Sequence, residues 1–286
     1  MKLKDVLDKT VQFFKEKNIE TPRLDAEILL AKALNLNSRV DLYMKYDQPL
    51  KEEELVACRE FVKRRSQGEP VAYITGEKGF FDYSFLVNKA VLIPRPETEL
   101  IVETALDWVK KNNIEKPKIL DLGTGSGCII ISLLKKIPEA QGIAVEKSAE
   151  AAAVAKENAQ RLGVFDRLEI LESDVLKSDF SKQNFDLIVS NPPYIAKDDQ
   201  RVEKDVKGFE PHAALYAEDN GRADLFQWSK MASPWLKDKS MMIFEMGFEQ
   251  GPEMLKHFEN LNSFQQNKIL KDLSGHDRII VGEKNG

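Results

Sequence analysis

The stretch "ILDLGTGSGC", Ile119 to Cys128, decides the expected fold of this chain. Its apolar start predicts a buried strand, and its glycines predict a tight turn into a helix that begins near Gly127. Glycines let a ligand lie against bare backbone, because no Cβ atom intervenes. The dinucleotide-binding pattern would need Gly or Ala at position 128, where Cys128 stands, so a dehydrogenase is disfavoured.

Seven short apolar stretches alternate with helical patterns from about residue 97 onward. They are "KILDLG", "GIAVE", "LEIL", "FDLIVS", "MMIFEMG", "FQQNKILKD" and "DRIIVG". Alternating strand and helix units of this length are typical of an open, doubly wound sheet. We therefore expect an α/β fold with a seven-stranded, mostly parallel sheet.

Residues 1–75 are predicted to form a small, separate helical domain. The stretch "VLDKTVQFFKEK" has apolar residues at helical spacing, and "TPRLDAEILLAKAL" opens with Thr21 as N-cap and Pro22 in the first turn. Residues 76–95 alternate and are rich in aromatic and β-branched side chains, which predicts a β-hairpin linker with its turn at Asn88 and Lys89. Residues 96–286 would then form the catalytic domain.

The composition is that of a globular protein, with 42% hydrophobic and 31% charged residues among 286. No apolar run reaches the roughly 20 residues that a membrane-spanning helix needs, and the charged N-terminus does not resemble a signal peptide. Cys58 and Cys128 lie far apart, and the three histidines show no metal-ligand spacing. These features predict a cytoplasmic protein with no membrane contact and no metal.

The charge balance argues against non-specific binding of nucleic acid. The net charge is −5, and residues 1–75 carry 14 basic and 13 acidic side chains, against 28 and 34 in the rest. Neither part has the basic excess that phosphate binding requires. We expect a monomer that forms no stable complex with nucleic acid.

Acidic residues stand at the ends of three successive predicted strands. Asp121 ends the first, Glu146 ends the second, and Asp174 follows the third with Val175 beside it. Each feature alone is often structural, because glycine turns are common and an acid after a strand is usually a helix cap. Together they lie along one crevice at the carboxyl ends of the strands.

The pattern Asp-x-Gly-x-Gly-x-Gly is typical of methyltransferases that use S-adenosylmethionine. Glu146 would accept both ribose hydroxyls, and Asp174 and Val175 would hold and flank the adenine. The remaining predicted cofactor residues surround the methionine part: Asp121, Gly123, Thr124, Gly125, Ser126, Gly127 and Asn191.

The fourth strand ends in "LIVSNPPYI", Leu187 to Ile195, where two prolines stop any regular structure. Such an end suits methyl transfer to a planar nitrogen, whose lone pair is delocalised and poorly nucleophilic. The side-chain oxygen of Asn191 and the carbonyl of Pro192 can accept hydrogen bonds from both N–H groups and orient that nitrogen. Pro193 helps to hold the carbonyl fixed, and Tyr194 can pack over the planar group. We expect these four residues to be catalytic and to bind substrate.

The chain resembles the HemK-type glutamine N5-methyltransferases of peptide-chain release factors over nearly its whole length. The resemblance rests on "GEKGFFDYSFLVNKAVLIPRPETE", "DLGTGSG", "NPPYI", "FEPHAAL" and "GHDRIIVG". It implies a class I, Rossmann-like fold and a substrate glutamine in the Gly-Gly-Gln loop of a release factor. The helical domain would then recognise this protein substrate.

Two departures from the family pattern concern Glu146, where Asp is more usual, and "EDNGRADL" (218–225), which is less glycine-rich than usual. Arg95, Glu97 and Thr98 line the substrate entrance in one interpretation and cap a helix in the other. Glu210 and Pro211 also have two interpretations: the family places this segment near the site, whereas the residues alone indicate only a loop.

Two rival hypotheses keep the same chemistry but change the target. One is another protein glutamine, such as one in a ribosomal protein, and the other is an adenine or guanine amino group. A nucleobase enzyme must extrude its base and bind phosphates, which the acidic catalytic part disfavours. A third hypothesis, a non-catalytic cofactor-binding module, is disfavoured by the intact Asn-Pro-Pro-Tyr sequence.

Overall fold

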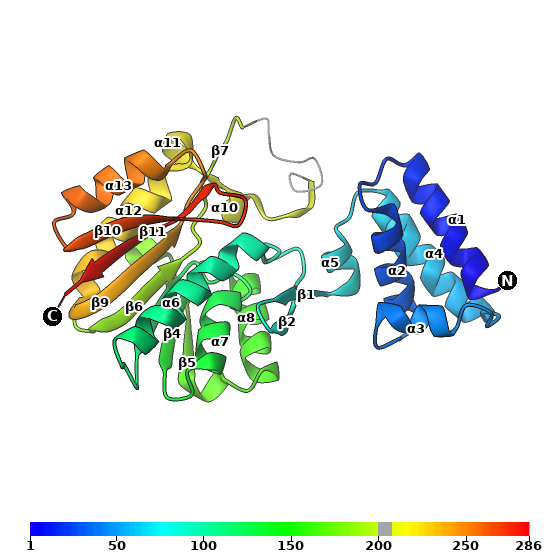
Figure 1. Ribbon diagram of the computed structural model, residues 1–286, viewed down its shortest axis with the longest axis horizontal. Coiled ribbons are helices and arrows are strands. Elements are labelled where there is room, and N and C mark those ends of the chain that lie inside the picture. Colours follow the sequence, from blue (N-terminus) through cyan, green and yellow to red (C-terminus); the bar gives the residue numbers. More distant parts are fainter. Residues whose placement is uncertain (200–207, 286) are drawn as a thin grey trace. The chain divides into compact units, whose positions relative to one another are not determined.

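The computed structural model describes residues 1–199 and 208–285, so positions 200–207 and 286 of the predicted catalytic domain lie outside the described residues. The chain divides into two compact units, of which the first contains Met1–Glu77 and the second begins at Lys78 (Figure 1). Each unit has a hydrophobic core of its own.

The first unit is helical, which confirms the predicted helical N-terminal region. Its helices are α1 (Leu3–Glu16), α2 (Pro22–Ala33), α3 (Arg39–Met44), α4 (Glu52–Ser66) and α5 (Val71–Thr75). In α1 the buried residues Leu3, Leu7, Val11 and Phe14 recur at the spacing of one helix face. They pack in one cluster with side chains of α2, including Leu29.

A two-stranded sheet follows, formed by β1 (Glu77–Phe80) and β2 (Tyr83–Leu86). The predicted turn at Asn88 and Lys89 is wrong, because the two residues between the strands are Phe81 and Asp82. Phe81 adopts a φ of 53° there, and its backbone N–H donates to Glu99 Oε1 at 2.8 Å. Asn88 makes a separate local turn, in which its Oδ1 accepts from the N–H of Ala90 at 2.8 Å.

The second unit contains a seven-stranded sheet, as predicted. Its strands are β3 (Lys118–Leu122), β4 (Gln141–Glu146), β5 (Leu168–Glu172), β6 (Phe185–Ser190), β9 (Leu236–Glu245), β10 (Gln266–Lys271) and β11 (Asp277–Lys284). The order is β10-β11-β9-β6-β3-β4-β5. The five strands from β9 to β5 are mutually parallel, and β11 runs antiparallel to both of its neighbours. The doubly wound, mostly parallel α/β fold is confirmed.

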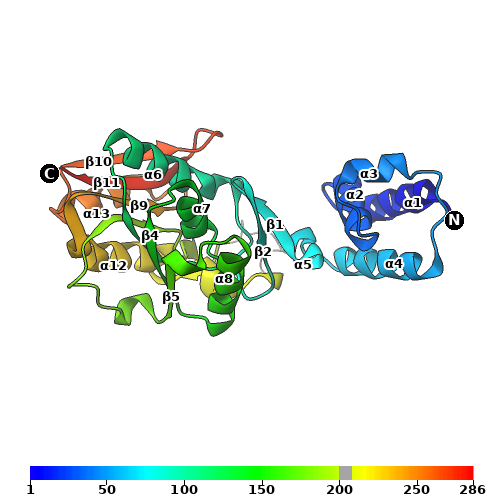
Figure 2. The ribbon, with the colours of Figure 1, turned by 90° about the horizontal axis from the view of Figure 1, so that it is seen from below.

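Helices cover both faces of this sheet, and Figure 2 shows α6 and α12 on opposite sides. The larger helices are α6 (Glu99–Lys111), α7 (Cys128–Lys136), α8 (Ala149–Arg161), α12 (Ala223–Ala232) and α13 (Gly251–Asn260). Shorter elements are η1 (Pro96–Thr98), η2 (Phe165–Arg167), η3 (Val175–Lys177), β7 (Ile195–Ala196), α10 (His212–Leu215), β8 (Tyr216–Ala217), α11 (Glu218–Gly221) and η4 (Ser233–Trp235).

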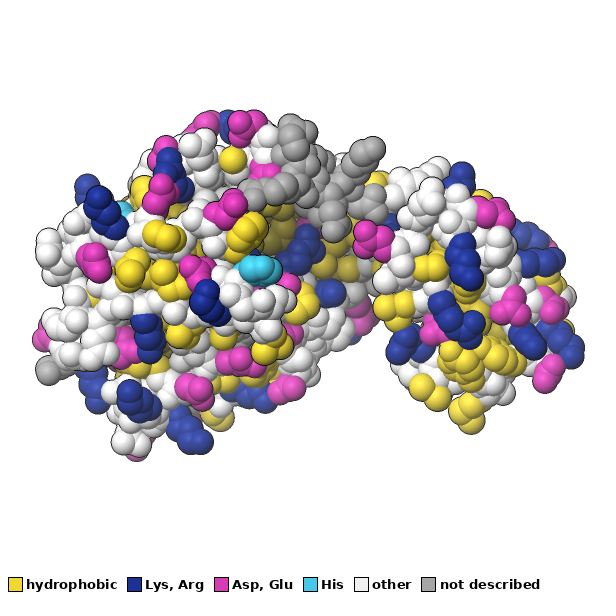
Figure 3. All heavy atoms as spheres, turned by 45° about the horizontal axis from the view of Figure 1, so that its top comes forward, with side chains coloured by type: hydrophobic (Ala, Val, Ile, Leu, Met, Phe, Trp, Pro, Cys, Tyr) yellow, Lys and Arg dark blue, Asp and Glu magenta, His cyan; other side chains and the backbone are white. Residues whose placement is uncertain are grey.

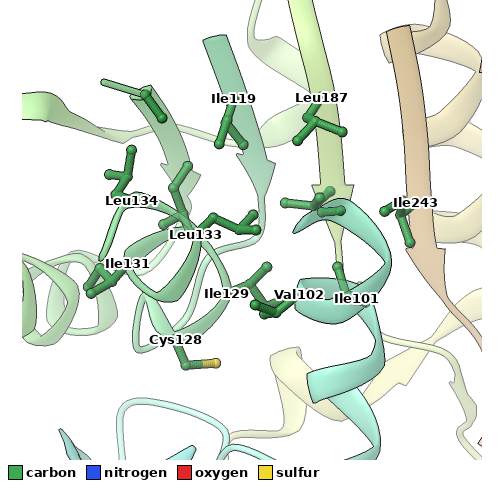
Figure 4. Close-up of a cluster of buried hydrophobic side chains, with 14 of the residues drawn as sticks. Ile101, Val102, Ile119, Cys128, Ile129, Ile131, Leu133, Leu134, Leu187 and Ile243 are labelled. Atoms are coloured by element: carbon green, nitrogen blue, oxygen red, sulfur yellow. The ribbon is translucent and has the colours of Figure 1, made fainter. Parts of the chain in front are cut away.

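Alternate side chains of the central strands enter two different cores. Ile119 of β3 and Leu187 of β6 pack with α6 and α7 on one face, as Figure 4 shows. Leu120 and Ile188, the next residues along each strand, pack with α12 and α13 on the other face. Strands buried on both faces must be apolar throughout, which explains the continuous apolar runs in the sequence.

The strand order reverses between the central strand β6 and its neighbour β3. At such a switch point the connections leave in opposite directions, so a crevice opens at the carboxyl ends of the strands. The hydroxyl of Ser190 joins these two ends by donating to the carbonyl of Leu122 at 2.7 Å. In the described part of the chain, no helix is both long and apolar enough to cross a membrane.

Candidate active site

The glycine loop leaves β3 and enters α7 in the predicted manner. Gly123, with a φ of 71°, and Thr124 both donate their backbone N–H groups to the carbonyl of Val145 in β4, at 2.9 and 3.1 Å. A Cβ atom on Gly123 would lie 2.9 Å from the ring of Trp228. The loop is therefore held against the neighbouring strand, and a side chain at position 123 would be strained and crowded.

Asp121 is fully buried beneath this loop. Its Oδ2 accepts a hydrogen bond from Thr124 Oγ1 at 2.6 Å, whereas its Oδ1 is buried without a partner. Burial, the largest cause, and the nearby Glu146 carboxylate together raise the pKa of Asp121 to about 7, although the hydrogen bond from Thr124 and the backbone N–H of Ile130 act in the opposite direction. A buried acceptor without a donor is costly, so Asp121 adds a strained polar group beneath the loop.

Glu146 ends β4 and reaches the glycine loop. Its Oε2 accepts from the backbone N–H of Gly125, and its Oε1 accepts from that of Ser148, both at 2.9 Å. The two bonds fix the plane of the carboxylate, and each oxygen keeps one lone pair for a further donor.

Asp174 and Val175 follow β5, the next strand along the same edge. Asp174 caps a short turn through the N–H of Leu176 at 3.0 Å and forms an ion pair with Lys147 at 2.9 Å. The hydrogen bond with Lys147 lowers the pKa of Asp174. Val175 is buried. The structure thus brings the three predicted acids to the ends of three adjacent strands.

The Asn-Pro-Pro-Tyr segment follows β6 at the same edge of the sheet. Asn191 donates from Nδ2 to Thr98 Oγ1 at 3.1 Å, and Tyr194 donates its hydroxyl to Glu245 Oε1 at 2.9 Å. Burial raises the pKa of the Tyr194 hydroxyl. Pro192 and Pro193 are both buried. Because Ser190 is bonded to Leu122, the segment starts beside the glycine loop.

Two family models match the chain in succession, the PrmC N-terminal domain at residues 5–76 and the Methyltransferase small domain at residues 98–231. The release factor glutamine methyltransferase of Rhodopirellula baltica is 37% identical over 282 residues, covering 98% of this chain and 95% of that protein. That of Chlorobaculum tepidum is 39% identical over 284 residues, with 96% and 94% covered. The chain belongs to the release factor glutamine methyltransferase family.

Solved structures support the methyltransferase fold of this family member. The catalytic domain of hMettl16, in complex with an RNA hairpin, superposes with a TM-score of 0.54 at 14% identity and covers 82% of this chain and 83% of that one. The T. thermophilus 16S rRNA methyltransferase RsmC, in complex with AdoMet and guanosine, has a TM-score of 0.52 at 16% identity, with 73% and 50% covered. These likenesses show the fold alone.

Arg95 is held by hydrogen bonds, whereas Glu97 is exposed. The guanidinium of Arg95 donates to Glu210 Oε1 at 2.6 Å and to the carbonyl of Ile93 at 3.1 Å. Glu210 is buried and also accepts from the N–H of Ile93, so it anchors the segment before α6. Glu97 is exposed. No hydrogen bond joins Arg95 or Glu97 to Asn191 among the described residues.

Sequence reasoning missed two residues of this methyltransferase site. Glu245, the last residue of β9, is 1% exposed and bonds both Thr98 and Tyr194. Gln250 donates from Nε2 to the carbonyl of Tyr194 at 3.1 Å and so braces the segment from outside. The position of Glu245 at the end of the apolar stretch "MMIFEMG" could have indicated its role. No sequence pattern indicates a role for Gln250.

In the described residues, no group of three or more His, Cys, Asp or Glu side chains could hold a metal ion. The acceptors found at this edge of the sheet are the carboxylates of Asp121, Glu146 and Asp174 and the amide oxygen of Asn191.

Proposed function

We propose that this chain transfers a methyl group from S-adenosylmethionine to the side-chain amide nitrogen, N5, of the glutamine in the Gly-Gly-Gln motif of peptide-chain release factors. The observation that carries the proposal is the 2.7 Å hydrogen bond between Ser190 and Leu122. This bond joins the strand that ends in Asn-Pro-Pro-Tyr to the strand that ends in the glycine loop. The chain also belongs to the release factor glutamine methyltransferase family.

The residues at the strand ends fit the cofactor. The carboxyl group of Asp121 lies buried beneath the loop, where its negative charge suits the ammonium of the methionine part, and Gly125, with open space at its Cβ position, leaves room for that part. Glu146 holds two lone pairs for the ribose hydroxyls, and Asp174 with Val175 flanks the adenine position. When bound, S-adenosylmethionine supplies an electrophilic methyl group on a positively charged sulfur.

Asn191 and Pro192 would prepare the accepting nitrogen. The Oδ1 of Asn191 and the carbonyl of Pro192 accept hydrogen bonds from the two N–H groups of the substrate amide. These bonds hold the nitrogen in place and favour localisation of its lone pair. Tyr194 would pack against the planar amide while its hydroxyl stays bonded to Glu245. Positioning of this kind can supply much of a rate enhancement without a covalent nucleophile. Arg95 and Glu97 would line the path of the incoming loop.

We further propose residues 1–75 as the recognition domain, 76–95 as a linker and 96–286 as the catalytic domain. Contacts divide the chain after Glu77, and the two family models match 5–76 and 98–231, which supports this division. The helical unit carries exposed apolar side chains: Leu24, Val40, Tyr43 and Met44. Figure 3 shows hydrophobic side chains gathered on the surface of this unit. Such a surface suits a protein partner.

The proposal also includes action as a monomer in the cytoplasm without stable nucleic-acid binding, which the net charge of −5 supports. Its test is incubation of the purified protein with isotope-labelled S-adenosylmethionine and a release factor, a ribosomal protein or RNA. Mass spectrometry then locates the label. A labelled Gly-Gly-Gln glutamine is the expected result, and label confined to RNA or to another protein would overturn the proposal.

A further inference from the structure

Glu245 is a buried carboxylate with no role in the reaction outlined above. It is the last residue of β9, and its strand lies parallel to β6 with Phe244 opposite Ser190. Glu245 therefore stands at the level where Asn191 leaves the sheet. Only 1% of its surface is exposed.

Both oxygens of Glu245 accept hydrogen bonds from hydroxyl groups. Thr98 Oγ1 donates to Oε2 at 2.6 Å, and the hydroxyl of Tyr194 donates to Oε1 at 2.9 Å. Thr98 in turn accepts from Nδ2 of Asn191 at 3.1 Å. The chain of bonds thus begins and ends on the Asn-Pro-Pro-Tyr segment, and Glu245 stands in its middle.

With Glu245 ionised, counting hydrogens fixes the direction of every bond in this chain. A threonine hydroxyl has a single hydrogen, whereas an ionised carboxylate can only accept. Once Thr98 gives its hydrogen to Glu245, its oxygen can only accept from Asn191. The NH2 group of Asn191 must then face Thr98, and its Oδ1 lies on the other side of the amide. Among the described residues, no group donates to that oxygen.

We propose that Glu245 is a positioning residue that fixes the orientation of the Asn191 amide through Thr98. With Glu245 as acceptor, Asn191 presents Oδ1 to the N–H groups of the substrate amide. If Thr98 instead donated to Asn191, the Asn191 amide would turn. Its NH2 group would then face the N–H groups of the substrate amide, and two donors repel each other. The proposal rests on the function proposed above, because it assigns Asn191 Oδ1 to the accepting nitrogen.

Charged neighbours act on Glu245 from several elements. Burial raises the pKa of Glu245, the hydrogen bonds from Thr98 and Tyr194 lower it, and of the nearby charges Arg278 on β11 lowers it while Glu97 in η1 raises it. Arg278 is itself paired with Asp272 at 3.0 Å. Burial is the largest of these causes, so the pKa of Glu245 is raised overall, and the two hydroxyl donors and the guanidinium oppose that rise.

The first test observes the amide itself and needs no substrate. In 15N-labelled full-length protein, the side-chain NH2 signal of Asn191 is assigned with N191D and recorded in wild type, E245Q and T98V. We expect both variants to shift this signal and to speed its exchange with solvent, because T98V removes the acceptor of Asn191 Nδ2 and the NH2 group of E245Q can donate to Thr98 and turn its hydroxyl hydrogen toward Asn191. The control is D186N, which removes a buried carboxylate at the other end of β6, where Asp186 bonds Lys118 and Lys237. An Asn191 signal that E245Q leaves unchanged would overturn the proposal.

The second test measures methylation of a release factor. E245Q and T98V should each lower kcat/KM about 10²-fold, the loss expected for a misplaced reacting group, while the affinity for S-adenosylhomocysteine stays within about twofold. T98S, which restores the hydroxyl, should recover most of the rate that T98V loses.

The double variant T98V/E245Q separates positioning from general damage. If both residues act through one amide, it should be no slower than the worse single variant, whereas independent losses would multiply. Multiplied losses, or weakened cofactor binding in E245Q alone, would overturn the proposal. If wild type methylates no glutamine at all, the proposed function fails, and the signal of Asn191 still decides the role of Glu245.

Discussion

The carboxylate of Glu146 accepts a hydrogen bond from the backbone N–H of Gly125, with 2.9 Å between Oε2 and the nitrogen. One side chain therefore both faces the proposed ribose position and holds the glycine loop. An aspartate, which is shorter by one methylene, would have to give up one of these contacts. The glutamate thus suits the geometry of this particular loop.

Glu146→Ala should weaken cofactor binding at least about tenfold, because hydrogen bonds to a charged acceptor contribute roughly 1.5–3 kcal/mol each. Calorimetric titration with S-adenosylhomocysteine measures the change. The matched control is Glu172→Ala, since Glu172 pairs with Glu146 in the register of β4 and β5 but is exposed. Unchanged affinity in the Glu146 variant would remove this residue from the cofactor site.

Asn191→Ala should lower the rate of methyl transfer by about 10²–10³-fold, or roughly 2.7–4 kcal/mol, as for other losses of a group that stabilises the transition state. Much of the cofactor affinity should persist, because the glycine loop and Glu146 hold the cofactor without Asn191. Single-turnover kinetics and calorimetry separate the two effects. Normal turnover in a folded variant would refute the role assigned to Asn191.

Gly221→Ala should disrupt the Asn-Pro-Pro-Tyr segment. A Cβ atom at position 221 would lie 2.2 Å from the carbonyl oxygen of Tyr194, and the φ of Gly221 is 82°. We expect lower stability together with a loss of methylation, measured by urea unfolding and single-turnover kinetics.

Gly163→Ala is the matched control for this variant. Gly163 has a similar φ of 69° but open space around its Cβ position. It should lose only the roughly 1–2 kcal/mol of left-handed backbone strain, with little effect on the rate. Equal rates in both variants would show that crowding at Tyr194 is unimportant.

The contribution of Asp121 to the stability of the protein should fall as pH rises from about 4 to about 7. Burial raises the pKa of Asp121 to about 7 in the folded protein, against about 3.9 in an unfolded chain. Between these values the folded state holds a proton that the unfolded state has released, so the free energy of unfolding decreases with pH.

Asp121→Asn lacks this proton and should lack this contribution. The free energy of unfolding of wild type minus that of the variant should therefore decrease across the same pH window and level off above it. Urea unfolding at several pH values gives both curves. Parallel curves would mean that Asp121 does not titrate in this range.

Met44→Asp should raise the KM for intact release factor about tenfold, which corresponds to 1.4 kcal/mol of binding. Met44 is 82% exposed, so the helical unit should fold normally. Methylation of a short Gly-Gly-Gln peptide should stay slow and unchanged, because a peptide is too small to use the helical unit. Leu273→Asp, at an even more exposed apolar position of the second unit, is the control. An unchanged KM in the Met44 variant would argue against recognition by this surface.

The sequence by itself determined the sheet and the line of acids along its edge. Apolar runs such as "FDLIVS" must be buried on both faces, and only a parallel sheet covered by helices provides this. The ends of such strands share one edge, so Asp121, Glu146 and Asp174 could be placed together without coordinates. The turn between β1 and β2 could not be predicted from the local sequence, because the backbone of Phe81 is held by the distant Glu99.

Only the tertiary structure decided how Asn191 is held. Thr98, Asn191 and Glu245 come from three separate parts of the chain, and each is an ordinary residue in its own segment. Their 3.1 and 2.6 Å bonds form because β6 and β9 are neighbours and η1 covers their ends. Local sequence specifies strands and turns through backbone preference and hydrophobic pattern, whereas the direction of a buried hydrogen bond depends on which donors the whole fold brings together.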